Sequence, residues 1–208
     1  MKRNWSTLIL FCLLLIGILY SCENTYTPKP TGYFRIDLPK KEYQSFDTTF
    51  PYSFEYPKYA KIVNDQNSPD EKYWINIVYP QFKGEIHLTY RKVNDNLTLY
   101  LQEAHNLVYK HMQKATAIRD NYFSEPDNNI YGITYEIEGV GAASPFQFVL
   151  TDSTSNYLRG ALYFDVKPNN DSLSPVINFV EEDILHLIKT FKWKEETDKT
   201  QNHDKTIS

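Results

Sequence analysis

The sequence predicts an α+β domain in which a long central helix and a C-terminal helix pack on a largely antiparallel sheet. Three stretches with the apolar pattern of strands come first, and one long helical stripe follows them. Three more strand-like stretches and a final helical stripe complete the order. Strands that follow one another without a helix between each pair are typical of antiparallel sheets, whereas parallel α/β sheets alternate the two kinds of element.

The first three strand-like stretches are rich in β-branched and aromatic residues. Residues 52–56 alternate aromatic and polar side chains, and residues 74–79 contain mostly strand-forming types. Residues 85–91 alternate apolar and polar side chains with a period of two, and a Lys83-Gly84 turn precedes them. We therefore expect residues 74–79 and 85–91 to pair as an antiparallel hairpin.

The period changes to a helical one at Leu97. From there to Ala115 an apolar residue recurs every three or four positions, which predicts a helix of about five turns. Asp95 or Asn96 could cap the N-terminus of this helix, because both side chains accept hydrogen bonds from free backbone N–H groups.

Strand signals return over residues 129–138, 146–150 and 157–166. Turn-forming residues separate them at 139–144 and 152–156. The first of these turns is glycine-rich, but it lacks the lysine and the spacing of a phosphate-binding loop and leads into a strand. We interpret it as a hairpin turn.

A final helix is predicted over residues 178–192, where apolar residues again have helical spacing. Three acidic residues, 181–183, fall in its first turn, and Lys189 and Lys192 fall in its last turn, which suits the helix dipole. By its order of elements the whole domain resembles the α/β/α sandwiches of the Mog1/PsbP-like group. That resemblance concerns the fold and carries no function.

The N-terminus has the pattern of a secretory signal peptide. Two basic residues precede the twelve apolar residues from Leu8 to Leu19. A helix of that length covers roughly 18 Å, whereas the hydrocarbon core of a bilayer is about 30 Å thick. The run therefore indicates a cleaved signal peptide over residues 1–21; a retained membrane anchor is the alternative.

The residues after the apolar run indicate lipidation. The sequence Leu19-Tyr20-Ser21-Cys22 resembles the lipobox of bacterial lipoproteins, although Tyr20 is larger than the residue usual there. The resemblance implies cleavage between Ser21 and Cys22, and attachment of acyl chains such as palmitate at Cys22. Two or more acyl chains anchor a protein stably to a membrane.

We expect residues 22–31 to form the lipidated tether, residues 32–195 a single domain, and residues 196–208 a disordered tail.

The composition excludes several classes of function. After removal of the signal peptide, 26 acidic residues outnumber 20 basic ones, and no basic stripe indicates a nucleic-acid partner. The two cysteines, Cys12 and Cys22, leave no thiol for a disulfide once the signal peptide is cleaved and Cys22 is acylated. His105 and His111 lie six residues apart, which places them on different faces of a helix. We find no catalytic constellation, no metal-binding motif and no cofactor motif.

A Pro-rich, aromatic and basic segment follows the tether. Its candidate partner-binding residues are Tyr33, Phe34, Arg35 and Asp37. A partner-binding segment and a strap that packs on its own domain are both consistent with this composition, because exposed aromatic and basic side chains serve either purpose.

The same segment carries a resemblance to a known family. Residues 28–39, Pro-Lys-Pro-Thr-Gly-Tyr-Phe-Arg-Ile-Asp-Leu-Pro, resemble the start of the gliding-motility lipoprotein D family (GldD) of Bacteroidota, and residues 50–57, 74–80 and 183–193 are similar to it as well. The resemblance implies no enzymatic activity. It implies a cell-envelope accessory protein required for gliding motility and the linked type 9 protein secretion machinery, whose partners are other gliding and secretion envelope proteins.

Two further expectations concern location and the alternatives. In the bacterial group that the resemblance implies, acidic residues just after the acylated cysteine are associated with export to the cell surface. Only Glu23 is acidic there, so we expect the periplasmic face of the outer membrane. A glycan- or peptide-binding envelope lipoprotein is the alternative function, and it requires a contiguous exposed aromatic patch. A hydrolase is the third reading, and it requires polar residues clustered in a deep pocket.

Overall fold

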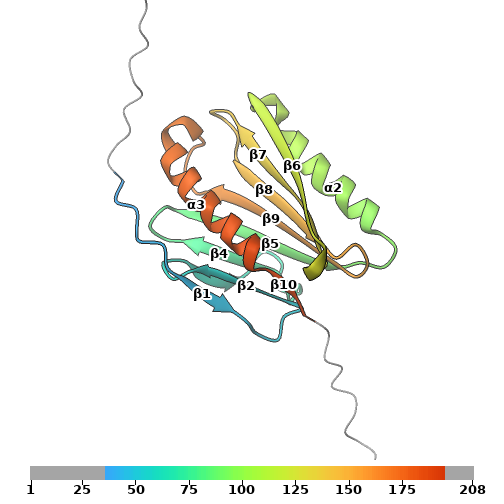
Figure 1. The fold of residues 1–208 in the computed structure, drawn as a ribbon. Coiled ribbons are helices and arrows are strands. Elements are labelled where there is room, and N and C mark those ends of the chain that lie inside the picture. Colours follow the sequence, from blue (N-terminus) through green and yellow to red (C-terminus); the bar gives the residue numbers. More distant parts are fainter. Residues whose placement is uncertain (1–35, 195–208) are drawn as a thin grey trace, which may run out of the picture. The chain divides into compact units, whose positions relative to one another are not determined.

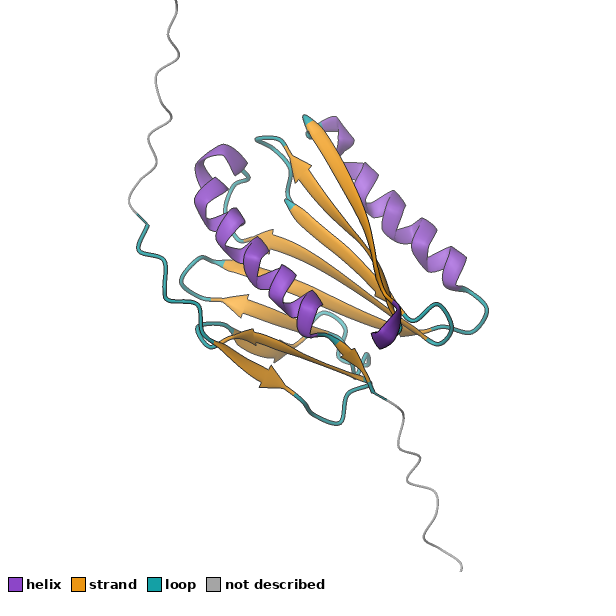
Figure 2. Ribbon diagram, in the orientation of Figure 1, coloured by secondary structure: helices purple, strands orange, loops and turns teal. Residues whose placement is uncertain are grey.

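The computed structural model describes residues 36–194, which form two antiparallel sheets and two α-helices (Figures 1 and 2). This confirms the predicted α+β class. The strands are β1 (Tyr43–Phe46), β2 (Tyr52–Pro57), β3 (Lys61–Asn64), β4 (Ile75–Tyr79), β5 (Gly84–Lys92), β6 (Ala117–Glu125), β7 (Ile130–Glu138), β8 (Phe146–Thr151), β9 (Asn156–Phe164) and β10 (Lys192–Trp193). The α-helices are α2 (Leu97–Tyr109) and α3 (Asn170–Thr190), and short 3₁₀ turns η1 (Lys110–Gln113) and η2 (Pro126–Asn128) precede β6 and β7.

The large sheet has seven strands in the order β3-β4-β5-β9-β8-β7-β6, and all neighbours are antiparallel. Its two faces pack against different helices, as Figure 1 shows. Along β8, the side chains of Phe148 and Leu150 enter the cluster that contains α3, whereas Val149 between them enters the cluster that contains α2. Successive residues of a strand point to opposite faces, so the helices lie on opposite sides of this sheet.

The larger of the two cores lies between the sheet and α3. Its side chains are almost all aliphatic or aromatic, and α3 contributes Val176, Val180, Ile184 and Leu187 to it. The small sheet, with the order β1-β2-β10, completes this core through β2, whose Tyr52 is fully buried. Apolar burial of this extent is the main source of folding free energy.

The predicted hairpin is confirmed, since β4 pairs with β5 and Ile77 lies opposite Ile86. The glycine-rich stretch is a hairpin turn between β7 and β8, as expected. It requires glycine at position 139, because Gly139 has a φ of 137° and an added Cβ would lie 2.4 Å from the carbonyl oxygen of Lys114.

The central helix is shorter than its apolar stripe predicts. The α-helix ends at Tyr109, and the chain continues as the 3₁₀ turn η1. Asn96 occupies the N-cap position, but its side chain makes no capping bond to the helix. That side chain instead accepts a hydrogen bond from the backbone N–H of Asn94 and donates one to the hydroxyl of Tyr100.

The predicted start of the final helix is wrong by eight residues. Helix α3 begins at Asn170, where the side chain of Asn169 accepts a hydrogen bond from the backbone N–H of Ser172. It continues through Pro175, because burial of the apolar residues that follow outweighs the lost backbone bond. Residues 181–183 therefore lie in the middle of α3 instead of its first turn. Lys189 lies in the last turn as expected, whereas Lys192 belongs to β10.

Four short or exposed strands, β1, β3, β6 and β10, were not expected from the sequence. The longest of them, β6, forms one edge of the large sheet and most of its residues are exposed. An edge strand with charged and polar side chains on both faces lacks the alternation that identifies a half-buried strand. The sequence pattern of residues 117–125 therefore does not predict a strand.

The turn between β8 and β9 depends on one carboxylate. Asp152 accepts hydrogen bonds through Oδ1 from the backbone N–H groups of Thr154, Ser155 and Asn156, at 3.0, 2.8 and 2.8 Å. Burial raises the pKa of Asp152, but these backbone donors lower it by more, so the net pKa lies below its usual range. The carboxylate is therefore the form that the fold stabilises.

We expect Asp152→Ala to lower the free energy of unfolding at pH 7 by about 1–2 kcal/mol, because three backbone donors lose their acceptor. A carboxyl with a lowered pKa in the folded state stabilises the fold above its unfolded pKa of about 3.9 and loses this effect as the pH falls through the folded value. The difference between wild type and variant, measured by thermal unfolding, should therefore shrink from pH 7 to pH 3. Asp152→Asn is the control, because it keeps an acceptor oxygen; an equal loss at both pH values would contradict the prediction.

Candidate functional site

Helix α2 covers only part of its face of the large sheet. It packs on β7, β8 and β9 through two small clusters that include Tyr135, Val149 and Tyr157. On β3 and β4 no helix among residues 36–194 packs against the same face, and on β5 the helix reaches only the far end, where Arg91 pairs with Glu103 of α2. We call this largely uncovered region, together with the end of β9 beside it, the open face; its outward side chains are Lys61, Val63, Val78, Glu85, His87, Thr89, Arg91 and Tyr163.

The open face mixes charged, aromatic and aliphatic side chains. Val63 is 39% exposed, and the others are half-buried or exposed. The imidazole of His87 lies 2.9 Å from a carboxylate oxygen of Glu85 and packs edge-on against the ring of Tyr163. His87 and Glu85 therefore form a polar pair on the strand face, and no third His, Cys, Asp or Glu of residues 36–194 joins them in a group that could hold a metal ion.

A pocket lies where the open face meets α2. Its volume is about 170 Å³, and we call it the sheet–helix pocket. Its lining consists of Trp74, Thr89, Arg91, Glu103, Ala104, Leu107, Tyr157 and Arg159. Apolar side chains form most of its wall, and two guanidinium groups and one carboxylate are its charged groups.

The two arginines of the pocket have different surroundings. Arg91 pairs with Glu103 at 2.6 Å, and its guanidinium lies over the rings of Trp74 and Tyr100 at 6.0 and 5.0 Å. Arg159 instead donates from Nη2 to the side-chain oxygen of Gln147, at 2.5 Å. Glu103 therefore neutralises Arg91, whereas the bond that fixes Arg159 goes to a neutral amide.

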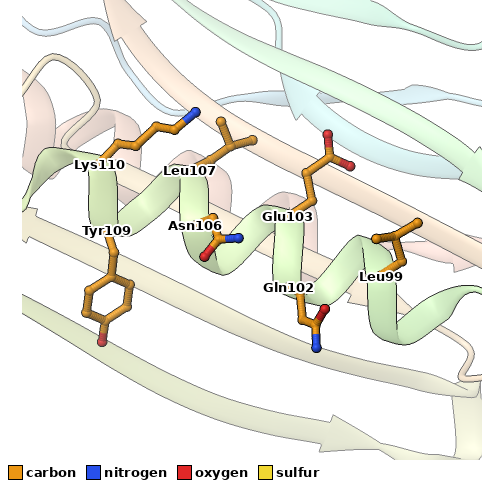
Figure 3. Close-up of a pocket in the computed structure, with 7 residues that line it drawn as sticks. All are labelled: Leu99, Gln102, Glu103, Asn106, Leu107, Tyr109 and Lys110. Atoms are coloured by element: carbon orange, nitrogen blue, oxygen red, sulfur yellow. The ribbon is translucent and has the colours of Figure 1, made fainter.

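The surface of α2 continues the pocket outward. Figure 3 shows Leu99, Glu103, Leu107 and Lys110 leaving the helix on one side and Gln102, Asn106 and Tyr109 on the other. Glu103 and Leu107 line both this outer hollow and the sheet–helix pocket. Leu99 is 61% exposed, so this side of the helix offers apolar as well as charged contacts.

A second polar cluster lies on the α3 side of the molecule. Asp183 is 1% exposed, and its carboxylate accepts hydrogen bonds from the Lys41 ammonium at 2.9 Å and from the hydroxyls of Tyr43 and Tyr59 at 3.0 and 2.6 Å. Burial, and then the bond to Asp183, raises the pKa of both tyrosines, so their hydroxyls remain donors. Lys41 also donates to the carbonyl oxygen of Phe179 at 2.7 Å.

This Asp183 cluster fastens the N-terminal part of the domain to α3. Lys41 precedes the small sheet, Tyr43 is the first residue of β1, and the ring of Tyr43 stacks on His186 of α3 at 3.6 Å. The imidazole of His186 in turn lies 2.7 Å from a carboxylate oxygen of Glu55. Every polar group of the cluster has a partner, which is typical of a structural network more than of a reactive one.

Most of the residues that the sequence predicts to be functional lie outside the described residues 36–194. These are Ser21, Cys22, Tyr33, Phe34 and Arg35. Asp37 is exposed, and its backbone carbonyl accepts a hydrogen bond from the side chain of Gln81 at 2.8 Å. The functions expected for these residues therefore remain predictions.

Sequence reasoning missed Arg159 and Asp183. A signal for Asp183 exists, because it falls three residues after Val180 and four before Leu187 and so interrupts an apolar helical stripe. A charged residue in such a stripe requires a partner. Arg159 offers no comparable signal, because its position on the α2 side follows only from the sheet order.

Within residues 36–194 the structure contains no group of three or more His, Cys, Asp or Glu side chains that could hold a metal ion. The two histidines of the central helical region have other surroundings. The ring of His105 stacks on the ring of Tyr109. Burial, followed by the nearby charges of Arg159 and Lys114, lowers the pKa of His111. No helix in the same range is long and apolar enough to cross a membrane.

The chain was compared with solved structures, with curated proteins and with models of protein families. The solution structure of the PsbP protein of the cyanobacterium Synechocystis sp. PCC 6803 is similar, with a TM-score of 0.46 and 12% sequence identity, over 79% of this chain and 99% of that one. A search of curated proteins finds no match. The model of the family described as gliding motility lipoprotein GldD matches residues 23–193. That match spans most of the chain, and the protein belongs to the GldD gliding motility lipoprotein family.

Proposed function

We propose that this lipoprotein is a lipid-anchored accessory of the cell envelope, required for gliding motility and for the linked type 9 protein secretion machinery. It acts through protein–protein contacts of the open face. Membership of the GldD family supports the motility role and the lipid anchor. The open face is the observation that carries the mode of action, because β3, β4 and part of β5 are left without a covering helix on this side among the described residues.

The composition of this surface supports a protein partner. Aromatic residues and arginine are enriched at the centres of protein–protein interfaces. Tyr163 and Arg91 belong to the open face, Trp74 lines the pocket beside it, and Leu99 lies exposed on the adjoining side of α2. An antiparallel sheet that faces only water is usually polar, whereas here apolar and charged groups alternate.

Cys22 provides the membrane attachment in this proposal. A diacylglyceryl group in thioether linkage to Cys22, together with an acyl chain on the amino group that cleavage after Ser21 exposes, would hold the domain on the periplasmic face of the outer membrane. The direct partners would be other envelope components of gliding and secretion, and Tyr33, Phe34, Arg35 and Asp37 could add contacts next to the anchor. The role is that of a binding and assembly factor and requires no catalysis.

Exposed aromatic side chains are too few to favour the glycan-binding alternative. Among residues 36–194, the exposed aromatic residues are Tyr122 and Tyr131, which are 73% and 36% exposed and lie on the edge strand β6 and on its neighbour β7. A sugar-binding platform requires a broader aromatic surface. The third reading, a hydrolase, also lacks support, because the sheet–helix pocket holds one carboxylate and that carboxylate is paired with Arg91.

Deletion of the gene is expected to abolish colony spreading and the secretion of type 9 cargo into the medium. Wild-type protein supplied in trans should restore both, whereas Cys22→Ala should restore neither and should not incorporate labelled palmitate. Spreading assays, immunoblots of the culture medium and membrane fractionation measure these outcomes. Normal spreading and secretion in a clean deletion would refute the proposal.

A matched pair of substitutions separates the open face from the rest of the surface. Val63→Asp adds a charge to the open face, and Leu185→Asp adds the same charge to an exposed position of α3; the two side chains are 39% and 48% exposed. Because both sites are exposed, neither change should prevent folding. Val63→Asp should reduce spreading and Leu185→Asp should not; equal behaviour of the two variants would remove the open face from the proposal.

A further inference from the structure

We propose that the sheet–helix pocket binds a carboxylate side chain of a partner polypeptide, and that Arg159 is the residue that recognises it. This inference rests on the proposed function and specifies the chemistry of the partner. It follows from the charge, the unpartnered hydrogen-bond donors and the walls of the pocket.

Arg159 is a half-buried cation that has no counter-ion in residues 36–194. Among the described residues it forms no salt bridge, and its hydrogen bond goes from Nη2 to the neutral side-chain oxygen of Gln147. Arg91, the other guanidinium of the pocket, is already paired with Glu103. A guanidinium removed from water is stabilised most by a carboxylate, which can accept two parallel N–H bonds.

The same place contains buried donors without acceptors. Nε of Arg159 and Nε2 of Gln147, which lies behind the pocket lining and bonds to Arg159, are buried and have no hydrogen-bond partner within residues 36–194, and Gln147 as a whole is 1% exposed. Buried polar groups in folded proteins are nearly always paired, because an unpaired donor costs free energy. Both orphan groups are donors, so the missing ligand is an acceptor. A rotation of the Arg159 side chain would bring its free N–H groups to an acceptor in the pocket.

The surrounding charges favour an anion as well. The lining holds two guanidinium groups, Arg91 and Arg159, and one carboxylate, Glu103, so the pocket carries one positive charge more than it has negative ones. The protein as a whole is acidic, with a formal net charge of −4. The pocket is therefore a positive site on a negative protein, and such a site attracts acidic groups selectively.

The walls and the size of the pocket indicate a side chain as the occupant. Trp74, Leu107 and Tyr157 give it an apolar lining, and its volume is about 170 Å³, which accommodates a side chain and not a large ligand. The pocket opens between the open face and the exposed side of α2 with Leu99. A polypeptide segment with an acidic residue between apolar ones complements this arrangement.

Two peptides that differ in one residue test this chemistry directly. The full lipidated protein, purified in detergent, is titrated with fluorescently labelled Ser-Leu-Glu-Leu-Ser and Ser-Leu-Gln-Leu-Ser, both with blocked termini, and binding is followed by fluorescence anisotropy. We expect the glutamate peptide to bind about tenfold more tightly or better. Arg159→Gln should abolish this preference, and Arg119→Gln on β6, outside the pocket, should keep it.

A further variant keeps the arginine and blocks the site. Thr89 lies opposite Arg159 in the pairing of β5 with β9, so Thr89→Glu places a carboxylate of the protein itself beside the guanidinium. This variant should also lose the preference for the glutamate peptide, while its thermal unfolding matches that of the wild type. Equal binding of the two peptides to the wild type, no binding of either, or a preference that survives Arg159→Gln would overturn the inference. None of these results bears on the deletion phenotype, which tests the proposed function separately.

Discussion

Replacement of Asp183 by alanine is expected to lower the free energy of unfolding by about 3–5 kcal/mol, because it breaks a buried ion pair by removing one partner. The carboxylate has no exposed side-chain surface, and it accepts hydrogen bonds from Lys41, Tyr43 and Tyr59. Without it, an ammonium group whose side chain is only 23% exposed and two hydroxyls lose their acceptor. Urea unfolding at pH 7, followed by circular dichroism, measures the loss.

Two further variants identify the cause of that loss. Asp183→Asn keeps one acceptor oxygen in the same volume and should cost less than the alanine variant. Lys41→Met removes the cation, so adding Asp183→Ala to Lys41→Met should cost less than adding it to the wild type. If the two effects simply add, the ion pair is not the source of the stability.

The bonds of Lys41 and Tyr43 to Asp183 determine where a force on the proposed lipid anchor reaches the domain. Lys41 and Tyr43 bond to Asp183 of α3, and they follow the predicted tether in sequence and precede β2. A pull on a lipid at Cys22 would therefore reach the Asp183 cluster before it reached β2. In the Asp183→Ala variant, limited proteolysis should cut the chain N-terminal to β1 faster than in the wild type.

The second large effect is expected at Gly160, where alanine should destabilise the protein by about 3 kcal/mol, the upper end of the usual cost of overpacking. Gly160 of β9 lies directly opposite Phe148 of β8, and an added Cβ would lie 2.1 Å from the ring of Phe148. Phe148 is fully buried in the main core, so its ring has no free space to move into.

Gly132 of β7 provides the matched control. An added Cβ there would lie 2.2 Å from the ring of Phe123, nearly the same overlap as at Gly160. However, Phe123 belongs to the edge strand β6 and is only half-buried, so its ring can turn toward solvent. We expect Gly132→Ala to change stability by less than about 1 kcal/mol, since the change also reduces the freedom of the unfolded chain. Equal losses in the two variants, measured by urea unfolding, would show that ring confinement does not decide the outcome.

The elements that the sequence predicted well are those whose signals are local. The hairpin of β4 and β5 follows from two neighbouring runs and one turn, and the central helix follows from a stripe within a single segment. The start of α3 was misplaced because Pro175 reads locally as a helix boundary, whereas burial of Val176 and Val180 keeps the chain helical around it. The edge strand β6 escaped notice because it has no buried face.

By itself the sequence determined the α+β class, the hairpin, the central helix and the resemblance to the GldD family, which the family comparison confirms. The assignment of Cys22 as the lipid anchor also comes from the sequence alone and stays a prediction.

Only the tertiary structure decided which residues meet: Asp183 bonds to Lys41, 142 positions away, and Arg159 lies across from Thr89, 70 positions away. Periodicity along a chain states which side of an element is buried, but not which distant element covers it. Within residues 36–194, the open face exists and Arg159 has no counter-ion because α2 packs on β7–β9 and reaches only the end of β5, and this arrangement results from packing between segments far apart in sequence.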